Sequence, residues 1–548
     1  KYLLSICVLL TTISNTIFAQ FRSDWQNQND RVWVGVDYWA NPLKDWRIIE
    51  GRLECINDQG KRNLQLITYQ IGQGGTELET SVKVGAIGDK KSQTGFRVGL
   101  KGNKNEYRFN TFWGKGLQFG LNQKEGKLFC FDEQRNEMLV EKNVDLKGME
   151  SFQLSLLVSP ISSGYKAQII LKSDDESTEL GQLIVSNLKN EHFSGNLALF
   201  ANSKYWFDNW EADGDKLVSA PENSWGPILW SQYTLSRGTL KLLALMAPIG
   251  EMDAQTVAFQ VKEQNEWKTL KSENIEPLSR TALFRFDNWK DDIDKPFRLA
   301  YQFNGGTVYW EGVIRKDPVD KSELSVAGFT GHKAYNFPNL EVVSNVGKHN
   351  PDMLFFSGDQ IYEDNGGYGV ERKDVEKAAL SYLSKYYMFG WSFGDLMRER
   401  PSVILPDDHD VFYGNIWGDS GDGYFMPVPW VNMVQRTQTG HLPDPADPKP
   451  LKNDIGVYFT DLVYGRVSFA VLEDRKFKTQ PTKIPADVRH TEKRPDWVTI
   501  EGFDPEKVNR EAYLLLGERK LGFLEHWASN WKGADIKVSL SQSTFAGV

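Results

Sequence analysis

The spacing of apolar residues changes once along the chain, near residue 320. Up to that point, short runs such as LQLITYQIG (64–72) and TVAFQVKEQ (256–264) alternate apolar and polar side chains, as half-buried antiparallel strands do. Beyond it, short apolar runs such as MLFFSGD (353–359) alternate with long helix-like segments such as residues 375–400. Because strands that alternate with helices form largely parallel sheets, the sequence predicts all-β domains followed by a layered α/β domain.

The length of the chain indicates how many domains these patterns form. A chain of 548 residues is too long for one hydrophobic core and corresponds to three or four domains. Residues 21–215 predict an antiparallel β-sandwich, whose closing segment SGNLALFANSKYWFDNWEADG resembles the last strands of laminin-G and concanavalin-like jelly rolls. Residues 216–318 predict an immunoglobulin-like β-domain. A charged, Pro-containing linker then leads to the α/β domain, residues 322–548.

The N-terminal segment has the pattern of an exported protein. Residues 1–20 combine one positive charge, a long apolar stretch and the small residue Ala19, which is typical of a secretory signal peptide; a membrane anchor is the alternative. We therefore expect a secreted or periplasmic (cell-envelope) protein with no membrane span in the mature chain. Cys55 and Cys130 would remain in that chain, either as one disulfide or as two buried thiols.

Composition limits the classes of partner. The formal net charge is −9 and no basic run is present, so we expect no nucleic-acid binding. An anionic substrate would then need a local positive charge, such as a metal ion. The aromatic residues of the first sandwich could bind a carbohydrate ligand on its surface, or they could fill its core.

Two strand ends in the α/β region carry ionisable groups at close spacing. The run MLFFSGDQIYED (353–364) delivers Asp359 and Tyr362 directly after a strand, and VILPDDHD (403–410) ends in three aspartates around His409. Ligands bind at the carboxyl ends of the strands in such sheets. Carboxylates this crowded would repel one another unless a cation neutralises them, although they could instead cap the next helix or turn.

The segments GDQIY and DDHD, together with HNPDMLFFSGD and FAVLEDRKFK, resemble the PhoD-like (alkaline phosphatase D) branch of the calcineurin-like metallophosphatases. The resemblance covers about residues 322–548 and implies two packed β-sheets flanked by helices, with two metal ions at the strand ends. It implies that Asp359 bridges the metals and that Tyr362 is a phenolate ligand of Fe(III), unless its ring only packs under the strand end. Asp408 is implied as a ligand of the second metal, Ca or another divalent cation, and His409 as the group that protonates the leaving oxygen or steadies the transition state.

Two features depart from that branch. Its first strand ends in a metal ligand, whereas the segment AGFTGHK offers only Thr330, Gly331 and His332 here. His332 could replace the missing ligand or could be a polar loop residue. The later His-containing segments that complete the metal site would lie beyond Val548, so we expect an α/β domain truncated at its C-terminus that by itself binds metal poorly.

Arg475 follows the strand VSFAVLED and could orient a substrate phosphate; an ion pair with Glu473 or Asp474 is the alternative. Together these patterns predict a secreted metal-dependent phosphoesterase that hydrolyses phosphate mono- or diesters with metal-activated water. Two alternatives stay open. One is a secreted glycan-binding or glycan-active protein in which the first sandwich binds or cleaves the glycan. The other is a phosphatase-like scaffold that has lost its activity.

Overall fold

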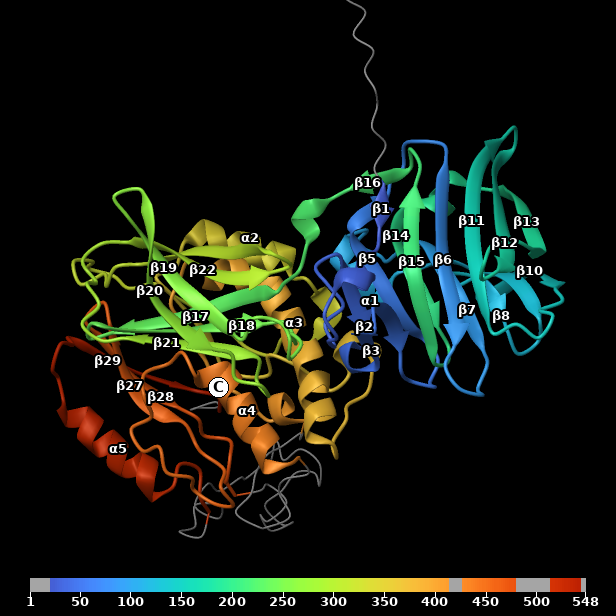
Figure 1. The fold of residues 1–548 in the computed structure, drawn as a ribbon. Coiled ribbons are helices and arrows are strands. Elements are labelled where there is room, and N and C mark those ends of the chain that lie inside the picture. The colour runs from blue at the N-terminus through green and yellow to red at the C-terminus, as the bar shows by residue number, and fades with distance from the viewer. Residues whose placement is uncertain (1–19, 413–425, 480–512, 544–548) are drawn as a thin grey trace, which may run out of the picture.

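The computed structural model describes residues 20–412, 426–479 and 513–543, which form two β-sandwiches followed by a part that mixes strands and helices (Figure 1). The first sandwich lies on one side of the molecule, and the other two parts lie together on the opposite side. All but the last residue of the predicted leader, residues 1–20, lies outside the described residues. Among the described helices, none is long and apolar enough to cross a membrane.

The first sandwich consists of two eight-stranded antiparallel sheets that face each other. One sheet contains β1 (Phe21–Arg22), β3 (Trp46–Ile49), β4 (Arg52–Cys55), β6 (Leu78–Ala86), β11 (Ser151–Ile161), β12 (Gly164–Ser173), β13 (Glu179–Leu188) and β15 (Tyr205–Asp213). The other contains β2 (Tyr38–Asn41), β5 (Arg62–Ile71), β7 (Gln93–Lys101), β8 (Lys115–Asn122), β9 (Lys127–Asp132), β10 (Glu137–Asn143), β14 (Gly195–Ala201) and β16 (Leu217–Ser219). A single short helix, α1 (Tyr107–Trp113), joins β7 to β8.

The core of this sandwich follows the predicted alternation. Along β11 the side chains of Phe152, Leu154 and Leu156 are buried, because successive residues of a strand point to opposite faces. Cys55 and Cys130 lie in the same core as free thiols, and burial raises the pKa of each to about 12. The structure thus has the two buried thiols, and the disulfide is not formed.

The second sandwich pairs a three-stranded with a four-stranded sheet. The first contains β17 (Ile228–Ser236), β18 (Thr239–Met246) and β21 (Thr281–Phe286). The second contains β19 (Thr256–Glu263), β20 (Glu266–Asn274), β22 (Lys295–Phe303) and β23 (Gly306–Ile314). All nine residues of β17 are buried, which means that both faces of this strand are covered, one by its own sandwich and one by the third part.

The third part has two small sheets and four helices among its described residues. The first sheet is parallel and contains β24 (Val326–Phe329), β25 (Met353–Phe356) and β26 (Ser402–Ile404). The second contains β27 (Phe459–Tyr464), β28 (Val467–Leu472) and β29 (Ile536–Ser541), with β28 and β29 parallel. The helices are α2 (Leu340–His349), α3 (Val375–Met397), α4 (Val428–Thr439) and α5 (Glu518–Ser529).

Strand β25 shows how these layers pack. Leu354 and Phe356 join the apolar cluster built on α3 and α4, whereas Met353, on the opposite face, joins the cluster that contains β27 and β28. The first sheet is therefore covered by helices on one face and by the second sheet and second sandwich on the other. This burial of both faces explains why β25 reads as a continuous apolar run.

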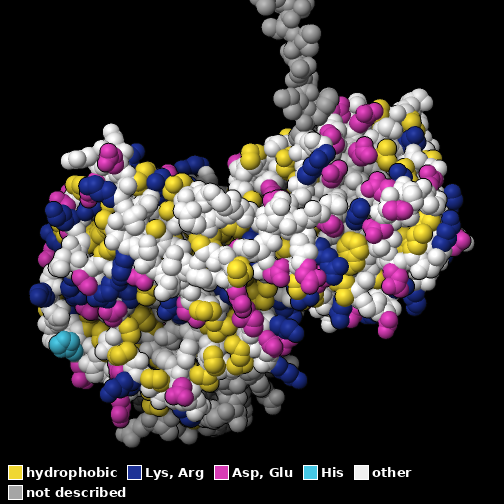
Figure 2. Space-filling model, in the orientation of Figure 1, with side chains coloured by type: hydrophobic (Ala, Val, Ile, Leu, Met, Phe, Trp, Pro, Cys, Tyr) yellow, Lys and Arg dark blue, Asp and Glu magenta, His cyan; other side chains and the backbone are white. Residues whose placement is uncertain are grey.

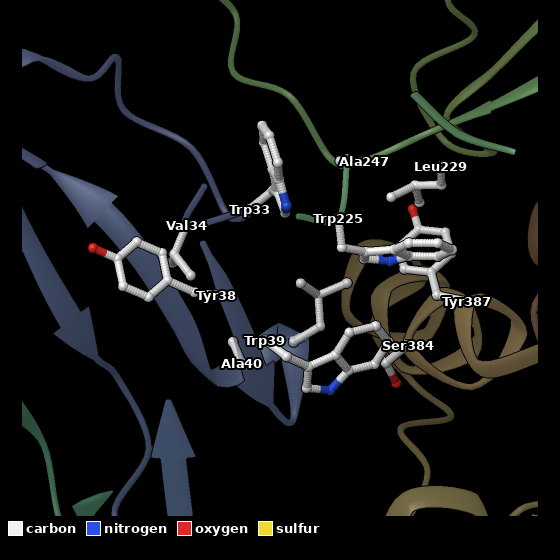
Figure 3. A pocket seen from close by; sticks show the side chains of 11 residues that line it. Trp33, Val34, Tyr38, Trp39, Ala40, Trp225, Leu229, Ala247, Ser384 and Tyr387 are labelled. Carbon is white, nitrogen blue, oxygen red and sulfur yellow. The ribbon is translucent and has the colours of Figure 1, made fainter. Parts of the chain in front are cut away.

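One apolar cluster contains residues of all three parts, in addition to the separate core of the first sandwich. Trp391 of α3 stacks on Trp39 of β2, with ring centroids 4.6 Å apart, and on Trp225, at 5.2 Å. A small cavity of about 20 Å³ lies beside these stacked rings. Its lining includes Trp33, Trp39 and Trp225 together with Tyr387 of α3 (Figure 3). The predicted linker, residues 315–324, is anchored as well, since the Arg315 N–H donates to the Tyr233 hydroxyl at 3.1 Å.

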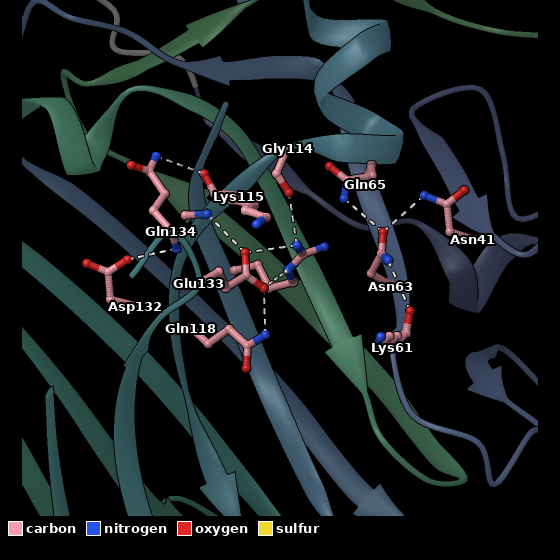
Figure 4. Close-up of polar contacts among 12 residues, drawn as sticks. Asn41, Lys61, Asn63, Gln65, Gly114, Lys115, Gln118, Asp132, Glu133 and Gln134 are labelled. Atoms are coloured by element: carbon pink, nitrogen blue, oxygen red, sulfur yellow. Dashed lines mark hydrogen bonds and ion pairs between the residues drawn. The ribbon is translucent and has the colours of Figure 1, made fainter. Parts of the chain in front are cut away.

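A polar network also joins the first sandwich to the third part. Asn63 of β5 receives hydrogen bonds at its Oδ1 from Asn41, at 3.1 Å, and from Gln65, at 2.8 Å (Figure 4). Its Nδ2 donates to the hydroxyl of Tyr368 at 3.0 Å, and that hydroxyl donates to the Lys61 carbonyl at 2.7 Å. The loop that follows β25 is therefore held against the sandwich by satisfied hydrogen bonds.

Surface charge is mixed on the visible face. Lys and Arg side chains alternate with Asp and Glu over both halves of the molecule in Figure 2, without a continuous basic area. This distribution agrees with the acidic net charge of −9.

Candidate metal centre

The carboxyl ends of β25 and β26 lie side by side because the two strands are parallel neighbours. Three residues beyond β25 is Asp359, and three and four residues beyond β26 are Asp407 and Asp408. One carboxylate oxygen of each of the three lies within 4.8 Å of the others. The structure thus brings together the two strand ends that the sequence singled out.

The glycine of the GD segment allows this approach. Gly358 has φ +121°, and a Cβ at this position would lie 2.4 Å from the Cβ of Asp407, so only glycine lets the second strand end come this close. Asp359 itself has φ 55°, in the left-handed region that Asp tolerates better than most residues. The turn at Gly358 and Asp359 thus lets the Asp359 carboxylate lie beside the second strand end.

Asp410 holds the two loops together. Its Oδ2 accepts hydrogen bonds from the backbone N–H groups of Asp359 and Asp407, both at 2.8 Å, and its Oδ1 accepts from the Ile361 N–H at 3.3 Å and from Gln438 Nε2 at 3.0 Å. The side chain is fully buried. Burial and the negative charge of Asp359 raise the pKa of Asp410 to about 8, while these N–H donors oppose the rise.

The three converging carboxylates are strongly perturbed. Burial and the negative charge of Asp408 raise the pKa of Asp359. Burial also raises the pKa of Asp407, and the positive charge of Arg475 opposes this rise. Arg475 contacts both aspartates of the second strand end, with Nε 3.1 Å from Asp407 Oδ1 and Nη2 3.2 Å from Asp408 Oδ1. Glu473, one of the partners that the sequence suggested for Arg475, pairs with Lys476 at 3.0 Å.

Tyr362 and His409 cover the open side of the cluster. The Tyr362 hydroxyl donates to Asp359 Oδ2 at 3.0 Å, and burial together with Asp359 raises the pKa of the phenol. The His409 ring lies against the Tyr362 ring, with centroids 4.4 Å apart, and its Nδ1 is 2.7 Å from Glu363 Oε2. Burial would lower the pKa of His409, but the hydrogen bond and charge of Glu363 outweigh burial and raise it to about 9.

The side chain of His332 is buried among phenylalanine rings. Its ring packs on Phe393 at 4.8 Å, on Phe356 at 5.8 Å and on Phe329 at 5.9 Å, and burial lowers its pKa to about 4. The backbone N–H of His332 donates to the Asp359 carbonyl at 2.8 Å. The residue thus supports the turn at Asp359 through its backbone, and it is not one of the three residues whose ligand atoms converge.

Three groups at the site received no role from the sequence. Asp407 joins the cluster itself, Asp410 braces it, and Glu363 holds His409. Asp407 and Asp410 belong to the crowded acidic segment DDHD, which the sequence singled out. Which of its aspartates faces the cluster depends on the turn after β26. Nothing in the sequence marked Glu363, because it pairs with a residue 46 positions away.

The donor set fits a hard metal cation. Asp359 Oδ1 is buried and has no hydrogen-bond partner, which is costly for a carboxylate oxygen unless a cation binds it. Asp359, Asp407 and Asp408 supply the oxygen ligands that Ca²⁺, Mg²⁺, Mn²⁺ and iron accept, and the Tyr362 oxygen lies beside them. Asp359, Asp407 and Asp408 are therefore the residues that would hold the metal, with Tyr362 as a further donor.

Comparison with known proteins gives structural similarities only. No protein-family model matches the chain, and no curated protein sequence matches it significantly. Among solved structures, the chain is similar to a carbohydrate-binding module, CBM66 from Bacillus subtilis, with 12% identity over 33% of this chain and 97% of that one and a TM-score of 0.24. Winged bean acidic lectin complexed with methyl-α-D-galactose matches with 12% identity over 37% and 100% of the two chains and a TM-score of 0.25. Lectin II from Ulex europaeus matches with 7% identity over 36% and 97% and a TM-score of 0.26.

Proposed function

We propose that this protein is a secreted, metal-dependent phosphoesterase of the PhoD-like kind. The observation that carries the proposal is the convergence of Asp359, Asp407 and Asp408 at the ends of two parallel strands, with one carboxylate oxygen buried and unpaired. The sequence segments GDQIY and DDHD contain all three side chains, and Asp359 and Asp408 are also metal ligands that the resemblance implies. Arg475 pairs with Asp407 and Asp408, which leaves the buried Asp359 Oδ1 as the carboxylate oxygen of the cluster that lacks a partner.

The residues around the carboxylates have distinct roles in this proposal. Asp359, Asp407 and Asp408, with Tyr362, would hold Fe(III) together with Ca or another divalent ion, which would supply the Lewis acidity for attack of water on the phosphoryl group. Arg475, which contacts Asp407 and Asp408, places a guanidinium beside the position of the substrate phosphate. His409, held by Glu363, carries a proton at the open side of the cluster and delivers it to the departing oxygen of the ester.

Removal of metal tests the proposal directly. We expect the intact protein to hydrolyse p-nitrophenyl phosphate, to lose this activity on treatment with a chelator, and to recover it when iron together with calcium or another divalent ion is restored. Activity follows release of p-nitrophenol, and bound metal is measured by elemental analysis. Undiminished hydrolysis by protein that holds no metal would show that the carboxylate cluster does not act as proposed.

Replacement of His409 should lower the rate of hydrolysis without lowering the metal content. We expect His409→Ala to lower kcat by about 10²–10⁴-fold, the usual contribution of a general acid, because the ring donates a proton and holds no cation. The metal content of this variant should stay at the wild-type value. Glu363→Gln, which keeps the size of the side chain but weakens the contact to Nδ1, should lower kcat less. If His409→Ala empties the site of metal, His409 is a ligand and the assignment of its role is wrong.

Carbohydrate binding by the first sandwich is the second candidate function. One observation favours it: helix α1 of that sandwich lines a cavity of about 240 Å³ with Phe109 and Trp113. If the protein acts only as a lectin, sugar binding will survive chelation and no phosphate ester will be hydrolysed. A scaffold that has lost its activity would likewise fail to hydrolyse esters when loaded with metal.

A further inference from the structure

A cavity lies at the junction between the first sandwich and the third part, and some of its lining residues follow His332 and Tyr362 closely in the chain. Its volume is about 240 Å³, whereas about 10–15 Å³ of such space holds one water molecule. It is lined by Phe109 and Trp113 of α1 and, from the third part, by Lys333, Tyr335, Asp364 and Asn365. The space therefore accepts an organic group of several atoms.

The aromatic wall comes from one face of α1. Phe109 and Trp113 are four residues apart, so both side chains lie on the same side of the helix, and their ring centroids are 4.9 Å apart. Glu106 caps this helix, since its Oε2 accepts from the Phe109 N–H at 3.0 Å. The two rings meet at 40° and touch each other, which gives an angular apolar wall and leaves no slot between parallel rings for a flat base.

The opposite wall is polar and belongs to the loops that build the metal centre. Lys333 follows His332 directly and pairs with Asp364 at 3.2 Å, and Asn365 is buried with its Oδ1 accepting from the Ala334 N–H at 3.4 Å. Tyr335 adds a ring that is 76% exposed. An ammonium, a carboxylate and an amide thus line the same cavity as the two aromatic rings of α1.

The aromatic ring of Tyr362 separates the cavity from the carboxylate cluster. Lys333 Nζ lies 5.5 Å from the centroid of the Tyr362 ring, and the hydroxyl of that ring is 3.0 Å from Asp359 Oδ2. Tyr362 therefore lies between Lys333 of the cavity and Asp359 of the carboxylate cluster. Contacts across the junction keep the walls in place, because Phe337 packs on Trp113 at 6.1 Å and Lys104 Nζ donates to the Asn336 carbonyl at 3.0 Å.

We infer that this cavity binds the sugar ring of a phosphorylated carbohydrate, with the first sandwich supplying the stacking surface and the metal centre supplying the phosphate site. A pyranose has an apolar C–H face that packs on aromatic rings, and its hydroxyls both donate and accept hydrogen bonds. The Lys333 ammonium and the Asp364 carboxylate provide a donor and an acceptor opposite the rings. Only the phosphate half of this inference rests on the proposed function.

Binding of plain sugars tests the cavity without hydrolysis. The intact protein is mixed with methyl glycosides of glucose, galactose and mannose, and saturation transfer from protein to ligand is recorded by NMR, with and without chelator. We expect a signal from at least one glycoside in both conditions, and its loss in Trp113→Ala and in Tyr335→Ala. Trp267→Ala is the matched control, because Trp267 is a half-buried ring in β20 of the second sandwich, away from the cavity; it should keep the signal. Tyr335 is 76% exposed, so we expect its replacement to leave the fold intact, and it provides the test if Trp113→Ala is unstable.

Kinetics on the metal-loaded protein test the link to the phosphate site. We expect Trp113→Ala to lower kcat/KM for a hexose phosphate by roughly tenfold and to leave kcat/KM for methyl phosphate, which has no ring, unchanged. Glycoside binding that depends on Trp113, in a protein that hydrolyses no ester, would support the sugar cavity and refute the proposed function. The inference is overturned if no glycoside binds, if binding is the same in both cavity variants, or if a nucleoside monophosphate is preferred to every hexose phosphate.

Discussion

Asp359→Asn is expected to remove both metal and activity. Asp359 offers the buried, unpaired Oδ1 of the cluster, and an amide in its place carries no charge to hold a cation. We expect the rate of p-nitrophenyl phosphate hydrolysis to fall by on the order of 10³-fold or more, since charge stabilisation at the reacting oxygens is lost. Elemental analysis should show a matching loss of metal. Normal metal content in this variant would contradict the assignment.

Tyr362→Phe provides the matched comparison at the same loop. It deletes one oxygen and keeps the ring that packs on His409, so the fold should be unchanged. If the phenolate binds Fe(III), the isolated protein is coloured by a ligand-to-metal charge-transfer band, and this variant loses the band while keeping part of its metal. A coloured variant, or an active iron-loaded protein without a visible band, would show that Tyr362 only hydrogen-bonds to Asp359.

Asp410→Ala is expected to be the most destabilising single change near the site. The substitution leaves buried donors without an acceptor, among them the N–H groups of Asp359 and Asp407, and each unsatisfied buried group costs about 1–3 kcal/mol. We expect a loss of at least about 3 kcal/mol, which corresponds to a decrease in Tm of roughly 6–12 °C for a unit of this size. Thermal unfolding followed by circular dichroism measures the decrease.

An aspartate with a similar but exposed role is the control. Asp374 caps α3, where its Oδ1 accepts from the Lys377 N–H at 2.8 Å at the surface. Asp374→Ala should cost only about 1 kcal/mol, because water replaces the lost acceptor. A Tm for Asp410→Ala within the range of this control would mean that the loops at the two strand ends do not depend on the buried carboxylate.

The local pattern of the sequence determined the element types and the two strand ends. Alternation in residues 256–264 predicts a half-buried strand, and β19 buries Val257, Phe259 and Val261 as expected, because strand periodicity depends only on neighbouring residues. The GD and DDHD segments could be located for the same reason, since each is a strand followed by a turn. Parallel pairing of β25 with β26 then brings Asp359 close to Asp407 and Asp408.

The surroundings of His332 and the walls of the cavity depend on contacts between segments that are distant in the sequence. The sequence allowed two roles for His332, a metal ligand or a polar loop residue. In the structure its ring lies among phenylalanines of β24, β25 and α3, and no local sequence pattern could predict these contacts. The cavity beside the site likewise needs Trp113 of the first sandwich and Lys333 of the third part, 220 positions apart. Backbone periodicity is a local property that the sequence by itself determines, whereas the partners of a buried ring, carboxylate or cavity wall depend on how whole layers pack, and only the tertiary structure decided them.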